Sequence, residues 1–310
     1  MGYFYIIYLI FTLNLQSFFI IKSVVFTTWF IRGGLLMKFR VFGDLHYSVN
    51  YKEITEFNGI RDRYYDYFIA HLFSKPADYY VSIGDLTNTG NPAEYAGIQT
   101  IIRKYDHHDK FQFTVGNHDM YIPTKAQVSE FFSTPLNRYF VQDDICVIFI
   151  DTTRQQHTFD WSGYIDESQL TWLDQVLTEN AEKTVIIFAH HPIYNTTMFS
   201  NQDKASIVKE VPIREVLNKH TRKAFYICGH VHADSIVHED NWTFVQIAAI
   251  LDQPIVREIE ITNNYFSIVT DGIGEEYRQL GSWLGSRMNH FLLADRGYQG
   301  DSNRHISIEF

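Results

Sequence analysis

From Met37 onward, short hydrophobic runs alternate with longer polar or amphipathic stretches. Each run is about five residues long and rich in Val, Ile, Phe or Tyr, which is typical of buried β-strands. We predict early strands at Lys38–Phe42, Tyr79–Ile83, Phe111–Val115, Cys146–Ile150, Thr184–Ala189 and Ala224–Cys228, and later strands at Thr243–Ala248, Val256–Ile261 and Tyr265–Thr270. The pair Asn263-Asn264 between the last two runs predicts a tight hairpin turn.

Helical periodicity falls between the early strands and is clearest over Glu167–Asn180. Asp166 is a suitable N-cap, and Gln169 three residues later completes a capping-box pattern. The stripe of hydrophobic residues that this helix would bury is Leu170, Leu173, Val176 and Leu177.

Weaker helical patterns occur at Arg61–Phe73, Ala93–Tyr105 and Ile207–Leu217. Alternating strands and helices, followed by a strand-rich end, favour an α/β domain with two sheets. We expect one domain over residues 37–272. Residues 273–310 then form a C-terminal extension packed on it, with a helix at Glu275–Leu284 and a terminal strand at His305–Phe310.

Residues 1–36 differ from the rest of the chain, since Met1–Ile21 has no charged residue and a second hydrophobic run, Ser23–Ile31, follows. One interpretation is a membrane anchor, with the main domain on the cytoplasmic side because basic residues follow the first run. The other is an untranslated leader of a bacterial gene, because Arg32-Gly33-Gly34 can be encoded by a ribosome-binding purine tract close to Met37. We favour the leader, and with it a cytoplasmic protein, and keep the anchor as the alternative.

Composition narrows the class of protein further. The chain of 310 residues is 45% hydrophobic and 20% charged, which is typical of a folded globular protein rather than a disordered one. Its net charge of −10 argues against a basic nucleic-acid-binding surface. The only cysteines, Cys146 and Cys228, lie in hydrophobic runs, so we expect buried thiols and exclude a disulfide scaffold.

Polar clusters follow five of the six early strands. The clusters are Gly43-Asp44-Leu45-His46, Gly84-Asp85, Gly116-Asn117-His118-Asp119, His190-His191-Pro192 and Gly229-His230-Val231-His232. Ligands of open α/β sheets bind outside the carboxyl ends of the strands, so we expect these side chains to converge. Each cluster alone is a weak signal, but five in this context predict a functional site.

Asp, Asn and His side chains without a thiolate suit Mn, Fe or Zn ions. A single tetrahedral ion needs four ligands, and the clusters offer about twice that number. The sequence therefore predicts two divalent or trivalent ions that share a bridging carboxylate. Two metals roughly 3.5–4 Å apart can bind both the attacking and the leaving oxygen in a phosphoryl transfer.

The series Asp44-x-His46, Gly84-Asp85, Gly116-Asn117-His118-Asp119, His190 and Gly229-His230-x-His232 resembles the motifs of the calcineurin-like metallophosphoesterase superfamily. The resemblance spans Met37 to Thr270. It includes Trp161–Leu177, which is similar to a stretch of smaller bacterial members such as cyclic-nucleotide and glycerophosphodiester phosphodiesterases. It implies a four-layer α/β/β/α sandwich, two mixed sheets flanked by helices, and metal-dependent hydrolysis of phosphoesters.

The resemblance also implies a metal ligand set. The ligands of the first ion would be Asp44, His46 and His232, those of the second would be Asn117, His190 and His230, and Asp85 would bridge the two ions. Of the adjacent histidines, His190 is favoured over His191 because the family has its ligand two residues before the proline.

The same resemblance gives His118 a role beside the metals rather than on them. It would stabilise negative charge in the transition state or protonate the leaving alkoxide. Asp119 would orient His118, as a carboxylate orients a catalytic histidine in other hydrolases.

Residues that flank the motifs are our candidates for substrate contacts: Tyr47, Asn88, His191 and Tyr194, with Arg154 and His157 reaching in from a loop. A packed or solvated loop position suits each of them at least as well. Since no long cap domain is evident, we expect a small phosphodiester or phosphomonoester substrate and no nucleic acid. The alternatives are a nuclease, which would need a basic groove, a lipid phosphoesterase if residues 1–36 are translated, and a non-catalytic scaffold.

Overall fold

The computed structural model describes residues 36–49, 57–294 and 301–310, which belong to one compact unit. The two interpretations of residues 1–36 concern a segment that lies outside this range, except for its last residue. Within the described part of the chain, no helix has the length and hydrophobicity needed to cross a membrane.

The first sheet has six strands in the order β12-β11-β10-β1-β2-β3. Their bounds are β1 (Met37–Phe42), β2 (Tyr79–Ile83), β3 (Phe111–Thr114), β10 (Ile255–Ile261), β11 (Tyr265–Gly272) and β12 (Ile306–Glu309). The strands β1, β2 and β3 are parallel, while β10 to β12 add antiparallel neighbours to the other side of β1. The beginning and the end of the domain therefore share one sheet.

The second sheet also has six strands, in the order β4-β5-β6-β7-β9-β8. Their bounds are β4 (Arg138–Gln142), β5 (Ile145–Phe149), β6 (Thr184–Phe188), β7 (Ala224–Cys228), β8 (Ser235–Glu239) and β9 (Trp242–Gln246). The four central strands are parallel and the two edge strands antiparallel, so both sheets are mixed, as predicted.

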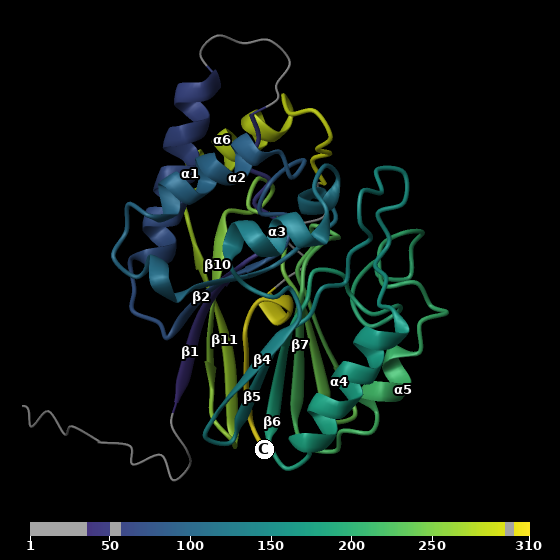
Figure 1. Cartoon of the computed structure of the whole chain (residues 1–310). Helices are drawn as coiled ribbons and strands as arrows, with labels where there is room; N and C mark the ends of the chain where they lie inside the picture. Colours follow the sequence, from purple (N-terminus) through teal and green to yellow (C-terminus); the bar gives the residue numbers. More distant parts are fainter. Residues whose placement is uncertain (1–35, 50–56, 295–300) are drawn as a thin grey trace, which may run out of the picture. The chain divides into compact units, whose positions relative to one another are not determined.

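Helices cover the outer faces of the two sheets (Figure 1). The helices are α1 (Phe57–Phe73), α2 (Pro92–Ile102), α3 (Lys125–Phe132), α4 (Glu167–Glu179), α5 (Ile213–Leu217) and α6 (Glu275–Gly285), with short 3₁₀ turns η1 (His108–Lys110), η2 (His118–Met120) and η3 (Asp301–Asn303). One hydrophobic cluster joins α1, α2 and α6 to the first sheet, and another joins α4 and α5 to the second. This arrangement confirms the predicted α/β/β/α sandwich.

A third hydrophobic cluster fills the space between the sheets. Phe39 of β1 meets Phe188 of β6 with ring centroids 5.3 Å apart, and Phe225 of β7 stacks on Phe266 of β11 at 3.8 Å. Both cysteines are buried free thiols, as expected. Because this core fixes the two sheets against each other, it also fixes the loops that leave their strands.

The predicted strands are all present, with ends that differ from the predictions by no more than two residues. The hairpin at Asn263-Asn264 is also present, closed by the Thr262 N–H, which donates to the Tyr265 carbonyl. Helix α4 has its capping box: the Asp166 carboxylate accepts from the Gln169 N–H at 2.8 Å, and the Gln169 side chain accepts from the Asp166 N–H.

Two edge strands and several helices differ from the sequence prediction. Helix α3 was not predicted, α1 begins before the predicted Arg61, and α2 ends before the predicted Tyr105. The strands β4 and β8 were not predicted, because β4 alternates between half-buried and exposed residues and β8 is exposed over its last three residues, so neither forms a continuous buried run. The predicted helix Ile207–Leu217 was too long, since only Ile213–Leu217 is helical. Pro212 precedes that helix, and Ile207 instead forms a bridge to Gly163.

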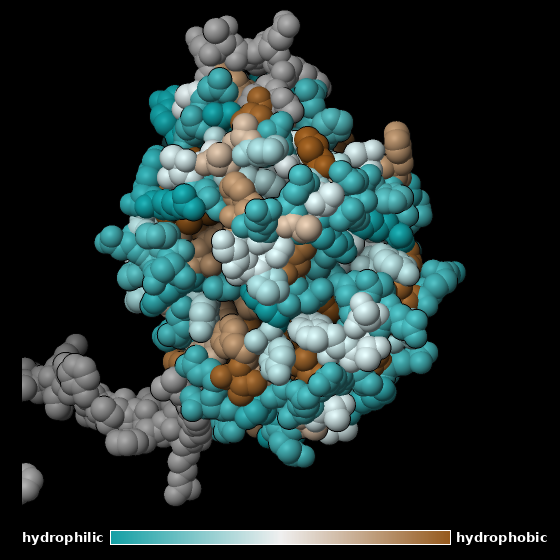
Figure 2. Space-filling model, viewed as in Figure 1, coloured by the Kyte–Doolittle hydropathy of each residue, from teal (hydrophilic) through white to brown (hydrophobic). Residues whose placement is uncertain are grey.

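The molecular face in Figure 2 is mainly hydrophilic, with hydrophobic residues in small, separate groups. Among the described residues, the most exposed large hydrophobic side chains are Phe159 (88%) and Leu292 (82%). Leu292 lies in the segment that follows α6.

Candidate metal centre and active site

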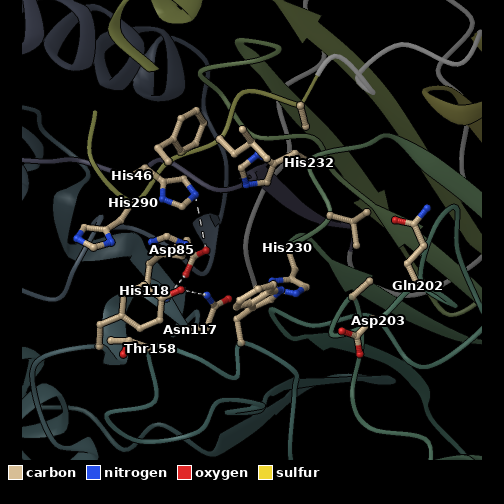
Figure 3. A pocket seen from close by; sticks show the side chains of 17 residues that line it. His46, Asp85, Asn117, His118, Thr158, Gln202, Asp203, His230, His232 and His290 are labelled. Atoms are coloured by element: carbon tan, nitrogen blue, oxygen red, sulfur yellow. Dashed lines mark hydrogen bonds and ion pairs between the residues drawn. The ribbon is translucent and has the colours of Figure 1, made fainter. Parts of the chain in front are cut away.

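The predicted ligands lie in the loops that follow five parallel strands. Figure 3 shows the five that line the pocket: His46, Asp85, Asn117, His230 and His232. The first sheet supplies the residues after β1, β2 and β3, and the second sheet supplies those after β6 and β7. Asp44, Asp85 and His190 are almost completely buried. The convergence that the strand pattern predicted is therefore present, and side chains from both sheets take part.

Donor atoms of these residues form overlapping groups in which all atoms lie within 4.8 Å of one another. The groups are Asp44-His46-His232, Asp44-Asp85-His190, His46-Asp85-His118 and His190-His191-His230. Asp85 lies between the two halves, since its Oδ2 is 3.6 Å from His46 Nε2 and 3.3 Å from His190 Nε2. This is the position that a bridging carboxylate requires.

Hydrogen bonds outside the cluster fix which ring nitrogen faces inward. His46 Nδ1 lies 3.2 Å from Asn88 Oδ1, and His190 Nδ1 lies 2.9 Å from the Ile83 carbonyl. Both partners are acceptors, so each Nδ1 donates its proton outward and each Nε2 faces the site, where the neutral ring would offer a lone pair. His46 Nε2 is buried without a hydrogen-bond partner, which is what an open ligand position looks like.

The two histidines after β7 are held in the same manner. His230 Nε2 lies 2.9 Å from the Lys204 carbonyl, which leaves its Nδ1 for the site. His232 Nδ1 lies 3.0 Å from Asp252 Oδ2, and its Nε2 lies 3.2 Å from Asp44 Oδ2. A carboxylate behind a histidine ligand is a common arrangement in metal sites. Asp252 follows β9 and belongs to no motif, so the sequence alone gives no signal for it.

His191 is adjacent to His190 but has both ring nitrogens occupied. Its Nδ1 lies 2.8 Å from Thr152 Oγ1, and its Nε2 lies 3.0 Å from the Trp161 carbonyl. Although His191 lies within one of the donor groups, both of its partners lie outside the proposed ligand set, whereas His190 Nε2 faces Asp85 and Asn117. The geometry therefore favours His190 over His191 as the ligand.

Electrostatics of the cluster also suit a cation. Burial alone would raise the pKa of Asp44, but His190 and His232 outweigh it and lower the pKa to about 2. Burial alone would lower the pKa of His190, but Asp85 and Asp44 raise it to about 9. The carboxylates thus remain ionised and draw positive charge into a buried place. Metal ions would replace the imidazole protons, because histidine ligands bind in the neutral form.

The backbone at the cluster is strained. His46, Asp85, His230 and His232 have φ angles of 52°, 47°, 70° and 58°, in the left-handed region that non-glycine residues rarely adopt. Such conformations persist only where the surroundings enforce them, and they gather at functional sites.

Two of the motif glycines make room for a carboxylate. A Cβ atom on Gly116 would collide with Asp85 Oδ1, and one on Gly229 would collide with Asp44 Oδ1. A glycine before the ligand of one loop therefore accommodates the ligand of another loop, which explains why glycine recurs in the motifs.

Comparison with known proteins identifies the family to which the chain belongs. The model of the calcineurin-like phosphoesterases matches residues 37–234, which include every predicted ligand. The chain belongs to this family. Its sequence relatives include a probable glycerophosphodiester phosphodiesterase GpdQ of Arcobacter nitrofigilis, 26% identical over 53% of this chain and 59% of that protein.

Two other relatives of this family member are named as cyclic-nucleotide enzymes. The cAMP/cGMP dual specificity phosphodiesterase MT0825 of Mycobacterium tuberculosis is 28% identical over 55% of this chain and 52% of its own. The 3',5'-cyclic adenosine monophosphate phosphodiesterase CpdA of Escherichia coli is 25% identical over 51% of this chain and 55% of that protein. The chain therefore spans only a little more than half the length of these relatives.

Solved structures support the fold of this phosphoesterase-family chain. A dimetal phosphatase from Danio rerio superposes with a TM-score of 0.62 at 14% identity, over 76% of this chain and 96% of that one. The purple acid phosphatase PPD1 of yellow lupin superposes with a TM-score of 0.51 at 10% identity. The match covers 77% of this chain and 52% of that one.

His118 lines the pocket of this family member and also belongs to a donor group with His46 and Asp85, and its orienting partner differs from the prediction. His118 Nδ1 lies 2.8 Å from the Asn88 carbonyl, and the His118 backbone N–H donates to Asp85 Oδ1 at 2.8 Å. The carbonyl of Asn88, rather than Asp119, therefore holds the ring of His118.

Asp119 instead ties the loops after β2 and β3 together. Its carboxylate accepts from the backbone N–H groups of Leu86, Thr87 and Gly116 and from the Thr87 hydroxyl, at 2.7–3.1 Å. Burial, assisted by the nearby Asp85, raises the pKa of Asp119 to about 7. The predicted catalytic pair is thus one pocket histidine and one loop-positioning carboxylate.

The four predicted substrate contacts do not line the pocket. Tyr47 is buried under α1, where its hydroxyl donates to Asp62, and Tyr194 lies at a separate surface depression beside α5. Asn88 and His191 lie next to the site but support other groups there.

The two loop candidates also stay outside the pocket. Arg154 pairs with Asp160 and packs over Tyr164, and His157 is exposed. Proximity to a motif in the sequence was therefore a poor guide to substrate contact.

The pocket has a volume of about 560 Å³, and residues that no motif contains form most of its wall. The wall residues outside the donor cluster include Tyr121, Thr158, Trp161, Gln202, Asp203, His290, Phe291 and Leu292. In the view of Figure 3, Gln202 and Asp203 lie opposite His46 and His290. Only Trp161 carried a sequence signal, since it begins the stretch that resembles the bacterial phosphodiesterases.

Proposed function

We propose that this protein hydrolyses small phosphodiesters with two metal ions bound at the donor cluster. The observation that carries the proposal is that two groups of donors meet at Asp85, with the imidazole lone pairs oriented inward by outer hydrogen bonds. The first ion would be held by Asp44, His46 and His232, the second by Asn117, His190 and His230, and both by Asp85.

The proposed ions would supply Lewis acidity, which activates water near neutral pH and neutralises phosphate charge. Asn117 suits its role because its Nδ2 donates to the Tyr121 hydroxyl at 2.9 Å, so that its Oδ1 faces His190 Nε2 at 3.1 Å. His118 donates through Nδ1 to the Asn88 carbonyl, so it would hold a proton for the leaving alkoxide on Nε2 as an imidazolium, whereas the neutral ring would present a lone pair there.

A diester substrate is favoured by the charge of the pocket wall. Among the described residues that line the pocket, none is Lys or Arg, and Asp203 adds a carboxylate. A phosphomonoester carries more negative charge than a diester, and beyond the proposed metal ions this wall has no Lys or Arg side chain to balance it. The relatives named as glycerophosphodiester and cyclic-nucleotide phosphodiesterases support the same preference.

The experiment is a comparison of two substrates with and without metal. The full chain is stripped with a chelator and reloaded with Mn²⁺, and hydrolysis of bis(p-nitrophenyl) phosphate is compared with that of p-nitrophenyl phosphate. We expect metal-dependent activity that is higher on the diester, with two ions bound per chain.

Variants connect that activity to the site. Asp85→Asn should lose both ions and the activity, whereas His157→Ala, which replaces an exposed histidine outside the pocket, should retain both. A chain that binds no metal and cleaves neither compound would contradict the proposal. Preference for the monoester would reject the diester assignment and keep the metal centre.

A further inference from the structure

Residues 289–294, which follow α6, form one wall of the pocket and contact the supports of two histidine ligands. We call this segment the C-terminal strap. It lies outside residues 37–234, the part that matches the family model. Its contacts with the site fall into three kinds, and each involves His46 or His232.

The first contact orients the support of His46. The Asn289 carbonyl accepts from Asn88 Nδ2 at 2.6 Å, and Asn88 Oδ1 lies 3.2 Å from His46 Nδ1. Because a carbonyl can only accept, Asn88 must turn its NH₂ group to the strap and its oxygen to His46. The strap thereby fixes the acceptor that keeps the proton of His46 on Nδ1.

The second contact holds the support of His232. The Ala294 backbone N–H donates to Asp252 Oδ1 at 3.0 Å, while Asp252 Oδ2 lies 3.0 Å from His232 Nδ1. One oxygen of the carboxylate is thus anchored by the strap and the other by the ligand. This leaves Asp252 little freedom to rotate away from His232.

The third contact is made by the ring of Phe291. Its centroid lies 4.8 Å from that of His46, with the planes at 69°, and 5.4 Å from that of His232, with the planes at 28°. Gly285, at the end of α6, makes room for this ring, because a Cβ there would lie 2.8 Å from Phe291 Cε1. Both imidazoles are therefore packed against one strap side chain.

The imidazoles assigned to the other ion are supported differently. His190 bonds the Ile83 carbonyl at the end of β2, and His230 bonds the Lys204 carbonyl of a loop between β6 and β7. Both supports lie inside the segment that matches the family model. The strap thus contacts the supports of one pair of ligands, and the family-matched segment supplies those of the other pair.

We propose that the C-terminal strap positions His46 and His232 and thereby sets the affinity of the first metal ion separately from that of the second. The inference rests on the proposed two-metal centre. Removing a strap contact should loosen two of the ligands of the first ion, and loss of outer supports of this kind lowers metal affinity by roughly 10–100-fold.

The test compares Phe291→Ala with Leu292→Ala in the full chain. Leu292 is the matched control, because it is the next strap residue, lines the same pocket and is 82% exposed. Mn²⁺ binding is measured by calorimetry and by competition with a fluorescent chelator. In Phe291→Ala we expect one of two ions to bind roughly 10–100-fold more weakly. The other ion should bind as in the unchanged protein, and Leu292→Ala should leave both affinities unchanged.

Different results separate the failure of this inference from that of the proposed function. If the unchanged protein binds no Mn²⁺, the two-metal centre itself is wrong. A second case is that the unchanged protein binds two ions. If Phe291→Ala then binds both with unchanged affinity, or loses affinity for both equally, the strap has no selective role. Thermal unfolding of the metal-free variants checks their folding, and Phe291→Leu, which keeps a hydrophobic side chain, should fall between Phe291→Ala and the unchanged protein.

Discussion

Each imidazole of the proposed centre has one nitrogen assigned to a support and one left for metal. His190 and His230 rely on backbone carbonyls, His46 on an amide oxygen, and His232 on the carboxylate of Asp252. A carboxylate support makes its histidine more basic than a carbonyl does. The four ligands therefore differ in chemistry although they are the same residue type.

At the same scale, His118 offers a clear test of role. It bonds the Asn88 carbonyl but also lies in a donor group with His46 and Asp85. If His118 is a proton donor, His118→Ala should lower kcat for the diester by roughly 10²–10⁴-fold while the chain still binds two ions. Metal analysis beside the kinetics checks this, and an equal loss of metal would make His118 a ligand instead.

The sequence allowed the convergence of the seven proposed ligands and His118 to be predicted, because each follows a strand in a short motif. Asp252 and Phe291 could not be predicted, since they reach the site through pairings of distant segments. The error at Tyr47 has a local cause. His46 has a left-handed φ of 52°, and the residue after this turn enters the core rather than the pocket.

At the scale of elements, the site is a set of loops held by buried strands. The strands that carry ligands were predicted well because they are continuous hydrophobic runs, with every residue of β6 and β7 buried. The edge strands β4 and β8 were not predicted. Half-exposed strands depend on their neighbours for stability, so their own sequences carry little signal. Helix α4 was predictable from its own sequence, since capping is a local interaction.

The loop after β3 makes a prediction at this scale. Gly116→Ala should displace Asp85, because the added Cβ would occupy the place of Asp85 Oδ1. We expect Mn²⁺ binding and diester hydrolysis to fall at least tenfold, as for other damage to metal-site supports.

Gly59→Ala is the control, since nothing lies within 4 Å of a Cβ on that α1 residue. That helix substitution should raise the free energy of unfolding by about 0.5–1 kcal/mol and leave activity unchanged. Normal metal binding in Gly116→Ala would contradict the geometry.

At the scale of the whole molecule, the proposed centre joins the two sheets. Asp44, His46 and Asp85 follow strands of the first sheet, and His190 and His230 follow strands of the second. An ion that binds residues from both sheets therefore binds the folded state and not the separate segments. The order of strands within the sheets, unlike the strands themselves, was beyond sequence reasoning, because it depends on pairings between distant segments.

This linkage predicts that metal stabilises the fold. At free Mn²⁺ 100 times its dissociation constant, each ion should add about 2.7 kcal/mol to the free energy of unfolding. Denaturant titrations of chelated and Mn²⁺-loaded protein would measure the gain. This gain in the free energy of unfolding should shrink as the pH falls, because protons compete for the imidazole ligands. Asp85→Asn should show little gain, and an equal gain in that variant would place the stabilising ions elsewhere.

The pairing of β1 with β10 also has a consequence for how the chain is made. Residues 37–42 of β1 pair on one side with β2, but their other side pairs with residues 255–261, which the ribosome adds much later. At ordinary rates of synthesis the delay is on the order of ten seconds. Until then β1 has an open edge, which invites pairing with another chain. A nascent or truncated chain that ends before β10 should therefore depend on chaperones in a way that the finished protein does not.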